Sequence, residues 1–108
     1  MDAVTIADAP QAERYEIRLD GELAGYAEYR GRGTVRAFTH TEIADGHEGQ
    51  GLGGRLVAFA LDDARAHERQ VVPICPFVAR YLAEHQAYLD LVAPELRRAF
   101  NLPEPRAS

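Results

Sequence analysis

The chain has 108 residues, of which 46% are hydrophobic and 27% are charged, and these values are ordinary for one soluble globular domain. The formal net charge of -5 and the scattered basic residues argue against a nucleic-acid-binding surface. The single cysteine, Cys75, excludes an internal disulfide. No stretch suits a membrane span, and Met1-Asp2-Ala3 does not resemble a signal peptide. We expect one cytoplasmic domain over residues 1–108, with a core at 13–92 and a tail at 93–108.

The first half of the chain predicts three strands joined by short turns. Residues 13–19 alternate between apolar and polar side chains, as a half-buried strand does. Asp20-Gly21 predicts a tight hairpin turn before a tyrosine-rich strand at 22–30. Gly31-Arg32-Gly33 then reverses the chain into a third strand at 34–43. These strands form an antiparallel meander, and alternation along the third strand puts its side chains on two faces. One face would hold Val35, Ala37, Thr39, Thr41 and Ile43, and the other Arg36, Phe38, His40 and Glu42.

The second half changes to a helical period. Apolar residues recur along one face of a helix that should end near His67, at Leu52, Leu56, Val57, Ala60, Leu61 and Ala64. The apolar run at 71–75 predicts a short parallel strand. Pro76 suits the first turn of a second helix ending near His85, and 86–92 could form a last strand. After Pro94 we expect a helical turn that packs Leu96 and Phe100 on the core, then a frayed end at 103–106.

Four glycines at 49, 51, 53 and 54 lie where the third strand gives way to the first helix. The first N–H groups of a helix have no intrahelical partner and carry partial positive charge, so this junction favours a phosphate or pyrophosphate group. A flexible cap is the alternative, although a cluster of four glycines usually has a backbone reason. The string also fits G-x-G-x-x-G, but the next strand lacks the acidic residue and the chain lacks the strands of a dinucleotide-binding fold.

The sequence resembles the GNAT superfamily of acetyl-CoA-dependent N-acetyltransferases. The loop Glu48-Gly49-Gln50-Gly51-Leu52-Gly53 matches the superfamily pattern at its glycines, while Glu48 replaces a basic or amide residue. The segments at 40–43, 72–78, 81–82 and 85–88 are similar to the short, single-domain subfamily of predicted acetyltransferases, although members often have proline where Gln86 stands. The resemblance covers residues 13–92 and implies an α/β fold (α+β in some schemes). Its mixed sheet has an antiparallel meander followed by a β-loop-α-β coenzyme-binding unit and a further helix.

The resemblance also implies where acetyl-CoA binds. The diphosphate would lie on the amides of the loop with Arg55 nearby, and a main-chain N–H in the Thr41–Ile43 region would polarise the thioester carbonyl. The cofactor-binding residues expected on this basis are Thr41, Ile43, Gly49, Gln50, Gly51, Leu52, Gly53, Gly54 and Arg55. No metal site is expected. The partners expected are acetyl-CoA and an amine, with neither nucleic acid nor membrane, in a monomer or homodimer.

Four residues are candidates for catalysis. Cys75 is either a reactive thiol near the acetyl group or a small buried hydrophobic residue. The first alternative arises because Cys75 precedes a helix N-terminus, which can lower the pKa of a thiol. Tyr81 occupies the helix where many GNAT enzymes carry the tyrosine that protonates the coenzyme thiolate, or it packs against Phe77. His40 and Glu42 lie two residues apart on one strand face, pointing towards the expected cleft, and either could relay a proton from the amine or be solvated.

The expected function is therefore acetyl-CoA-dependent N-acetylation of an unidentified amine on a protein, peptide or small molecule. The first alternative is a non-catalytic acyl-CoA-binding or regulatory module that keeps the loop. The second is a small structural domain without a coenzyme.

Overall fold

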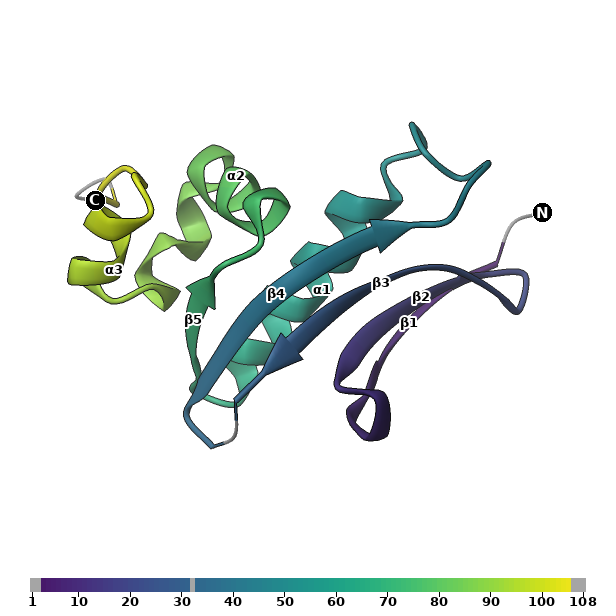
Figure 1. The fold of residues 1–108 in the computed structure, drawn as a ribbon, viewed down its shortest axis with the longest axis horizontal. Coiled ribbons are helices and arrows are strands. Elements are labelled where there is room, and N and C mark those ends of the chain that lie inside the picture. The colour runs from purple at the N-terminus through teal and green to yellow at the C-terminus, as the bar shows by residue number, and fades with distance from the viewer. Residues whose placement is uncertain (1–2, 32, 106–108) are drawn as a thin grey trace.

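The computed structural model describes residues 3–31 and 33–105, which form one five-stranded sheet in the order β1-β2-β3-β4-β5 (Figure 1). The strands are β1 (Val4–Ala9), β2 (Arg14–Leu19), β3 (Glu22–Arg30), β4 (Val35–Ile43) and β5 (Gln70–Pro73). The first four are antiparallel, and β5 pairs in parallel with β4. This confirms the predicted mixed sheet. The predictions made on Met1, Asp2, Arg32 and Arg106 lie outside the described residues.

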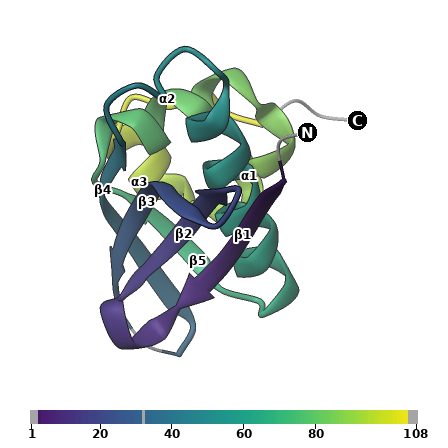
Figure 2. The same cartoon turned by 90° about the vertical axis from the view of Figure 1, so that its right-hand side faces the viewer.

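All the helical elements except the 3-10 turn η1 follow β4 in the chain. They are α1 (Leu52–Ala66), α2 (Pro76–Glu84) and α3 (Pro94–Ala99), together with the 3-10 turns η1 (Pro10–Ala12) and η2 (Gln86–Leu91). All the residues predicted for the apolar face of α1 are buried. Helix α1 packs across one face of the sheet and contacts all five strands, behind β3 and β4 in Figure 1 and alongside the curved strands in Figure 2. No helix in the described ranges has the length and apolar character needed to span a membrane.

The hairpin between β2 and β3 forms as predicted, because Asp20 and Gly21 take up the positive φ angles of 51° and 85° that a two-residue turn requires. The strand β1 was not predicted. It pairs with β2 and packs Val4 and Ile6 partly against the core. Its alanines and Asp8 have low strand propensity, so pairing with β2 determines its structure more than its own sequence does.

The prediction for the two faces of β4 is wrong beyond Phe38. Tyr29 of β3 pairs with Phe38 and Glu28 pairs with His40, so Thr39 is an extra residue in β4, a β-bulge. Phe38 is buried against the helices, whereas His40 beyond the bulge is exposed. A one-residue insertion exchanges the faces of every later side chain, and the bulge therefore reverses His40 and Glu42 relative to Phe38.

The suggested last strand at 86–92 is also wrong, because this segment forms η2. The N–H of Tyr88 donates to His85 O and the N–H of Val92 donates to Leu89 O, each over 3.1 Å. Leu89 and Val92 are fully buried in this conformation. The strand β5 therefore remains an edge strand, and its four residues including a proline are typical of a protected edge.

The helical turn predicted after Pro94 is confirmed. Leu96 lies in the short helix α3 and Phe100 directly follows it, and both pack partly buried against the core. Residues 103–105 have no regular secondary structure, although Glu104 accepts a hydrogen bond from Arg97 Nε at 3.0 Å.

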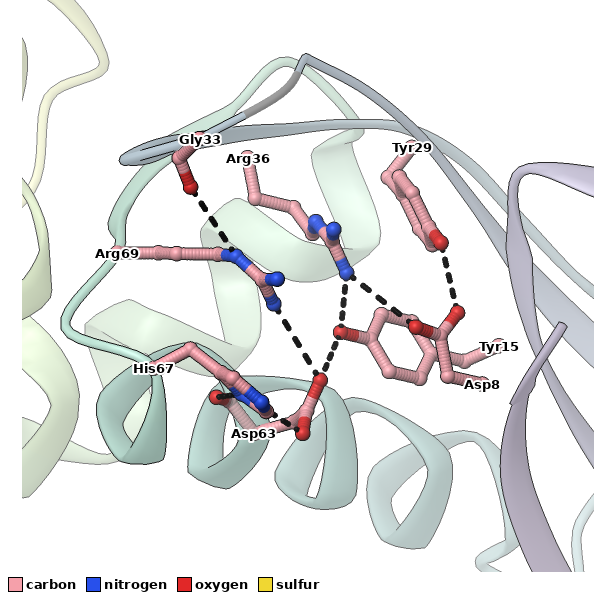
Figure 3. Close-up of polar contacts among 8 residues, drawn as sticks. All are labelled: Asp8, Tyr15, Tyr29, Gly33, Arg36, Asp63, His67 and Arg69. Carbon is pink, nitrogen blue, oxygen red and sulfur yellow. Dashed lines mark hydrogen bonds and ion pairs between the residues drawn. The ribbon is translucent and has the colours of Figure 1, made fainter. Parts of the chain in front are cut away.

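A polar cluster with a buried arginine ties the sheet to α1 at the end of β4 opposite the glycine loop (Figure 3). Arg36 is 6% exposed, and its Nη1 donates to the hydroxyl of Tyr15 over 2.6 Å. That hydroxyl donates in turn to Asp63 of α1, also over 2.6 Å. Arg36 lies over the ring of Tyr29 at 3.8 Å and has Asp8 of β1 at 3.7 Å. The cluster therefore joins β1, β2, β3, β4 and α1 through one guanidinium group.

Candidate functional site

The two parallel strands separate where the glycine loop approaches them. Pairing between β4 and β5 ends at Phe38 and Pro73, after which the N–H of Cys75 donates to Phe38 O over 2.8 Å. Beyond this point the chain after β5 turns away into α2, while β4 continues to Ile43 (Figure 1). A wedge therefore opens between the end of β4 and the start of α2.

The free edge of β4 in this wedge offers main-chain donors. The N–H of Ala44 donates to Ala24 O on the β3 side over 2.7 Å. Peptide groups point alternately to the two edges of a strand, so those of Thr41 and Ile43 point to the edge that β5 has left. This is the region where the resemblance implies that a thioester carbonyl is polarised.

Cys75 lies at the narrow end of the wedge and meets one of the predicted cofactor-binding residues there. It is the N-cap residue of α2 and is 4% exposed. Its thiol donates to the hydroxyl of Thr41 over 3.4 Å. The fold therefore brings together two candidate residues that are 34 positions apart in the sequence.

The wide end of the wedge holds the glycine loop and a cavity of about 270 Å³. Its lining comprises Ile43, His47, Glu48, Gly49, Gly51, Leu52, Gly53, Gly54 and Phe77. Gly49 and Gly51 have φ angles of 81° and 75°, which glycine adopts at little cost. These turns deliver the chain into α1, whose first N–H groups have no intrahelical partner. Most of the predicted loop residues thus line one cavity, although Gln50 is exposed and is not part of its wall.

Of the other two glycines, Gly53 is required for close packing between α1 and α2, whereas Gly54 has room for a Cβ atom. A Cβ atom on Gly53 would lie 2.8 Å from Cζ of Phe77, and one on Gly54 would lie 3.7 Å from Cε2 of Tyr81. Gly53 therefore allows the Phe77 ring to lie against the start of α1. The glycine cluster combines two requirements, turn geometry at 49 and 51 and helix approach at 53.

Two polar residues before the glycines also line the cavity. Glu48 Oε1 accepts a hydrogen bond from the N–H of Gly46 over 3.1 Å, so its carboxylate folds back on the loop. His47 has a buried Nδ1 without a hydrogen-bond partner. His47 and Phe77 were not among the site residues predicted from the sequence. Their positions directly beside the loop and at the start of α2 were the available signals.

A wider groove of about 520 Å³ adjoins this cavity between α1 and α2, and Phe77 lines both. Arg55 and Tyr81 line the groove. The Tyr81 ring stacks on His85 with 3.8 Å between ring centroids. Burial, together with the negative charge of Asp62, raises the pKa of Tyr81, so its hydroxyl keeps its proton near neutral pH.

His40 and Glu42 do not face the loop, and the predicted orientation of this pair is wrong. In register they lie opposite Glu28 and Tyr26, whose side chains are on the sheet face away from α1. Directly opposed residues share a face. His40 Nε2 and Glu42 Oε1 lie 3.1 Å apart on this outer face, with about half of each side chain exposed.

The described parts of the chain contain no group of three histidine, cysteine or acidic side chains placed to hold a metal ion.

Comparison with known proteins identifies the family to which the chain belongs. The family model of GCN5-related N-acetyl-transferases matches residues 14–91. The chain belongs to this family. The matched range includes β2 to β5, the glycine loop and α2, which are the elements that build the wedge.

Solved structures share the fold of this family member. A GCN5-like protein from Staphylococcus aureus aligns with a TM-score of 0.66 and 21% identity over 86% of this chain and 91% of that one. A ribosomal-protein-alanine N-acetyltransferase from Brucella melitensis biovar Abortus 2308 aligns with a TM-score of 0.53 and 20% identity, over 74% of this chain and 60% of that one. No functionally curated protein matches the sequence at a significant level.

Proposed function

We propose that the protein transfers an acetyl group from acetyl-CoA to an amine. The observation that carries this proposal is the wedge, which places the glycine loop at the start of α1 beside the free edge of β4. Helix N–H groups and the loop amides suit a diphosphate in a chain whose net charge is -5. Arg55, one turn into α1, adds a cation in the adjoining groove.

The residues of the wedge supply the remaining functions. The N–H groups of Thr41 and Ile43 would polarise the carbonyl of the bound thioester, as donors aimed at a developing oxyanion do. Tyr81, which keeps its proton, would supply it to the departing thiolate. Cys75 would lie beside the reacting carbonyl through its contact with Thr41. We propose that it positions this end of the site, and a covalent acetyl intermediate is not required.

Two measurements test this function. Acetyl-CoA at millimolar concentration should raise the melting temperature, because a ligand specific for the folded state stabilises it. Acetyl-CoA with a panel of amines should then release free coenzyme thiol. Failure of the melting temperature to respond would contradict the coenzyme site. Binding without thiol release across amines and peptides would instead favour the non-catalytic acyl-CoA-binding module.

A further inference from the structure

The outer face of the sheet carries a separate hollow beside the end of β4. Its volume is about 220 Å³, and it is lined by Leu23, Gly25, Tyr26, Glu42 and Ala44. Four of the five lining residues are apolar or aromatic, and Glu42 is the acidic one. A small apolar hollow with one convergent charge is the usual form of a site for a small group of opposite charge.

The hollow lies next to the coenzyme wedge, on the other face of the sheet. Glu42 and Ala44 line the hollow, whereas Ile43 between them lines the loop cavity. One strand therefore separates the two spaces. Pairing between β4 and β5 ends at Phe38, so the edge of β4 at this level has no strand beside it. A carbonyl held on the N–H of Thr41 or Ile43 at that edge could be attacked from the hollow.

The local charges favour a cation in the hollow. Burial, followed by the negative charges of Glu42 and Glu28, raises the pKa of Tyr26. Arg14 lies over the Tyr26 ring, with its Cζ 4.6 Å from the ring centroid, but its charge is already paired, because its Nε lies 2.8 Å from the carboxylate of Glu16. Glu42 Oε1 lies 3.1 Å from His40 Nε2, and the hydroxyl of Tyr26 lies beside the same carboxylate. An ionised carboxylate has about four acceptor positions, so Glu42 can accept a further donor.

We propose that this hollow is the acceptor site and that the substrate is an ammonium group on a short, uncharged, apolar stem. The proposal rests on the acetyl transfer proposed above. Glu42 binds the ammonium group and His40 accepts one of its protons. The neutral nitrogen then forms a bond to the thioester carbonyl carbon, the carbon–sulfur bond breaks, and Tyr81 protonates the thiolate. The second proton leaves the acylated nitrogen for the carboxylate of Glu42, and solvent restores the proton of Tyr81. The stem lies against Leu23, Tyr26 and Ala44.

The size and charge of the hollow limit the substrate. Sites for drug-sized ligands have volumes of about 300–1,000 Å³, so the 220 Å³ hollow suits an alkyl chain or a single side chain. A carboxylate on the stem would meet Glu42 and be repelled. A lysine side chain and a free alkylamine present the same chemistry, and the experiment must distinguish these two sources.

The test compares butylamine, Nα-acetyl-lysinamide and glutamate as acceptors with the full chain and acetyl-CoA. Butylamine or Nα-acetyl-lysinamide should show a kcat/KM at least about tenfold above that of glutamate, since an unfavourable charge contact costs a kcal/mol or more. Glu42→Gln should raise the KM of the preferred amine by about 10- to 100-fold, because a charge-assisted hydrogen bond is lost. Leu23→Trp, which fills the hollow, should raise it as well. Glu13→Gln removes the same charge at the opposite end of the sheet and serves as the control.

Binding of each partner is measured separately, so that the two proposals can fail separately. The Kd of acetyl-CoA should stay within about twofold in Glu42→Gln and Leu23→Trp, because a substitution has little effect on a site with which it shares no contact. If acetyl-CoA does not bind the wild-type chain, the proposed function fails. If it binds and amines are acetylated, but both variants leave the amine KM unchanged, the hollow is not the acceptor site.

An NMR titration of butylamine into the coenzyme-free protein tests the hollow without turnover. Shifts centred on Leu23, Tyr26 and Glu42 that disappear in Glu42→Gln support the proposal. Their absence at millimolar butylamine overturns it. Acetylation of Nα-acetyl-lysinamide but not butylamine would assign the stem to a protein or peptide lysine, and efficient use of butylamine would assign it to small amines.

Discussion

Removing the hydroxyl group of Tyr15 should lower the free energy of unfolding substantially while hardly changing the shape of the side chain. It donates to Asp63 of α1 and accepts from Arg36 of β4, both over 2.6 Å. Tyr15→Phe keeps the fully buried ring and removes only this link between the sheet and the helix. The two charged partners would remain near each other without the atom that both contact.

The magnitude follows from the two contacts. A hydrogen bond to a charged group contributes about 1.5–3 kcal/mol, so the upper limit for two is about 6 kcal/mol. Asp63 retains His67 at 3.2 Å, and Arg36 retains Asp8 at 3.7 Å, which reduces the loss. We therefore expect the free energy of unfolding to fall by about 2–4 kcal/mol. Because domains of this size have roughly 5–15 kcal/mol of stability, the variant should still fold.

Urea unfolding followed by circular dichroism would measure the change. The midpoint should fall while the slope with denaturant stays the same, because the surface exposed on unfolding is unchanged. Tyr88→Phe is the matched control. It removes one exposed hydrogen bond, from the hydroxyl to Asp62 over 2.8 Å, and should cost about 1 kcal/mol or less. A loss in Tyr15→Phe no larger than in Tyr88→Phe would refute the view that the buried cluster stabilises the sheet on α1.

Three further predictions concern the coenzyme site and alkaline pH. Glu48→Gln keeps an acceptor for the N–H of Gly46 but removes a negative charge from the cavity. Calorimetry should therefore show acetyl-CoA binding several-fold more tightly, and weaker binding would contradict the proposed coenzyme site. Cys75→Ala should lower kcat more than it changes the Kd of acetyl-CoA, whereas unchanged turnover would assign the thiol to packing. Burial and the bond to Asp8 raise the pKa of Tyr29 to about 12, above the unfolded value of about 10. The stability this gives is complete below pH about 10 and lost as pH rises towards 12, so unfolding free energy should fall over that range and less so in Tyr29→Phe.

The alternation and turn signals of the sequence were enough to predict β2, β3 and α1. The range predicted for β3 agrees with the observed Glu22–Arg30, and every apolar residue predicted for the face of α1 is buried. These elements could be predicted because the spacing of apolar residues within each segment differs, with a period of two in a strand and 3.6 in a helix. The glycine loop could be placed for the same reason, since its residues lie between two clear periods.

The segments that failed are those whose conformation depends on a distant partner. Residues 4–9 form a strand because β2 offers an edge, and residues 86–92 form a 3-10 turn because Leu89 and Val92 reach the core that way. Neither the strand pairing of residues 4–9 nor the packing of residues 86–92 leaves a strong pattern in the local sequence. A short apolar segment fits a strand or a helical turn equally well until its neighbours are known.

The sequence by itself determined what the loop of this protein is suited to hold. Its glycines at a strand-to-helix junction specify backbone turns and free N–H groups, which depend on local geometry alone. Only the tertiary structure decided which side chains face that loop. The bulge at Thr39 exists in the pairing of β4 with β3, and it turns His40 and Glu42 to the outer face while Thr41 meets Cys75. Because one inserted residue exchanges the faces of a strand, no pattern within β4 could have revealed which of its two sets of candidate residues shares the buried face of Phe38.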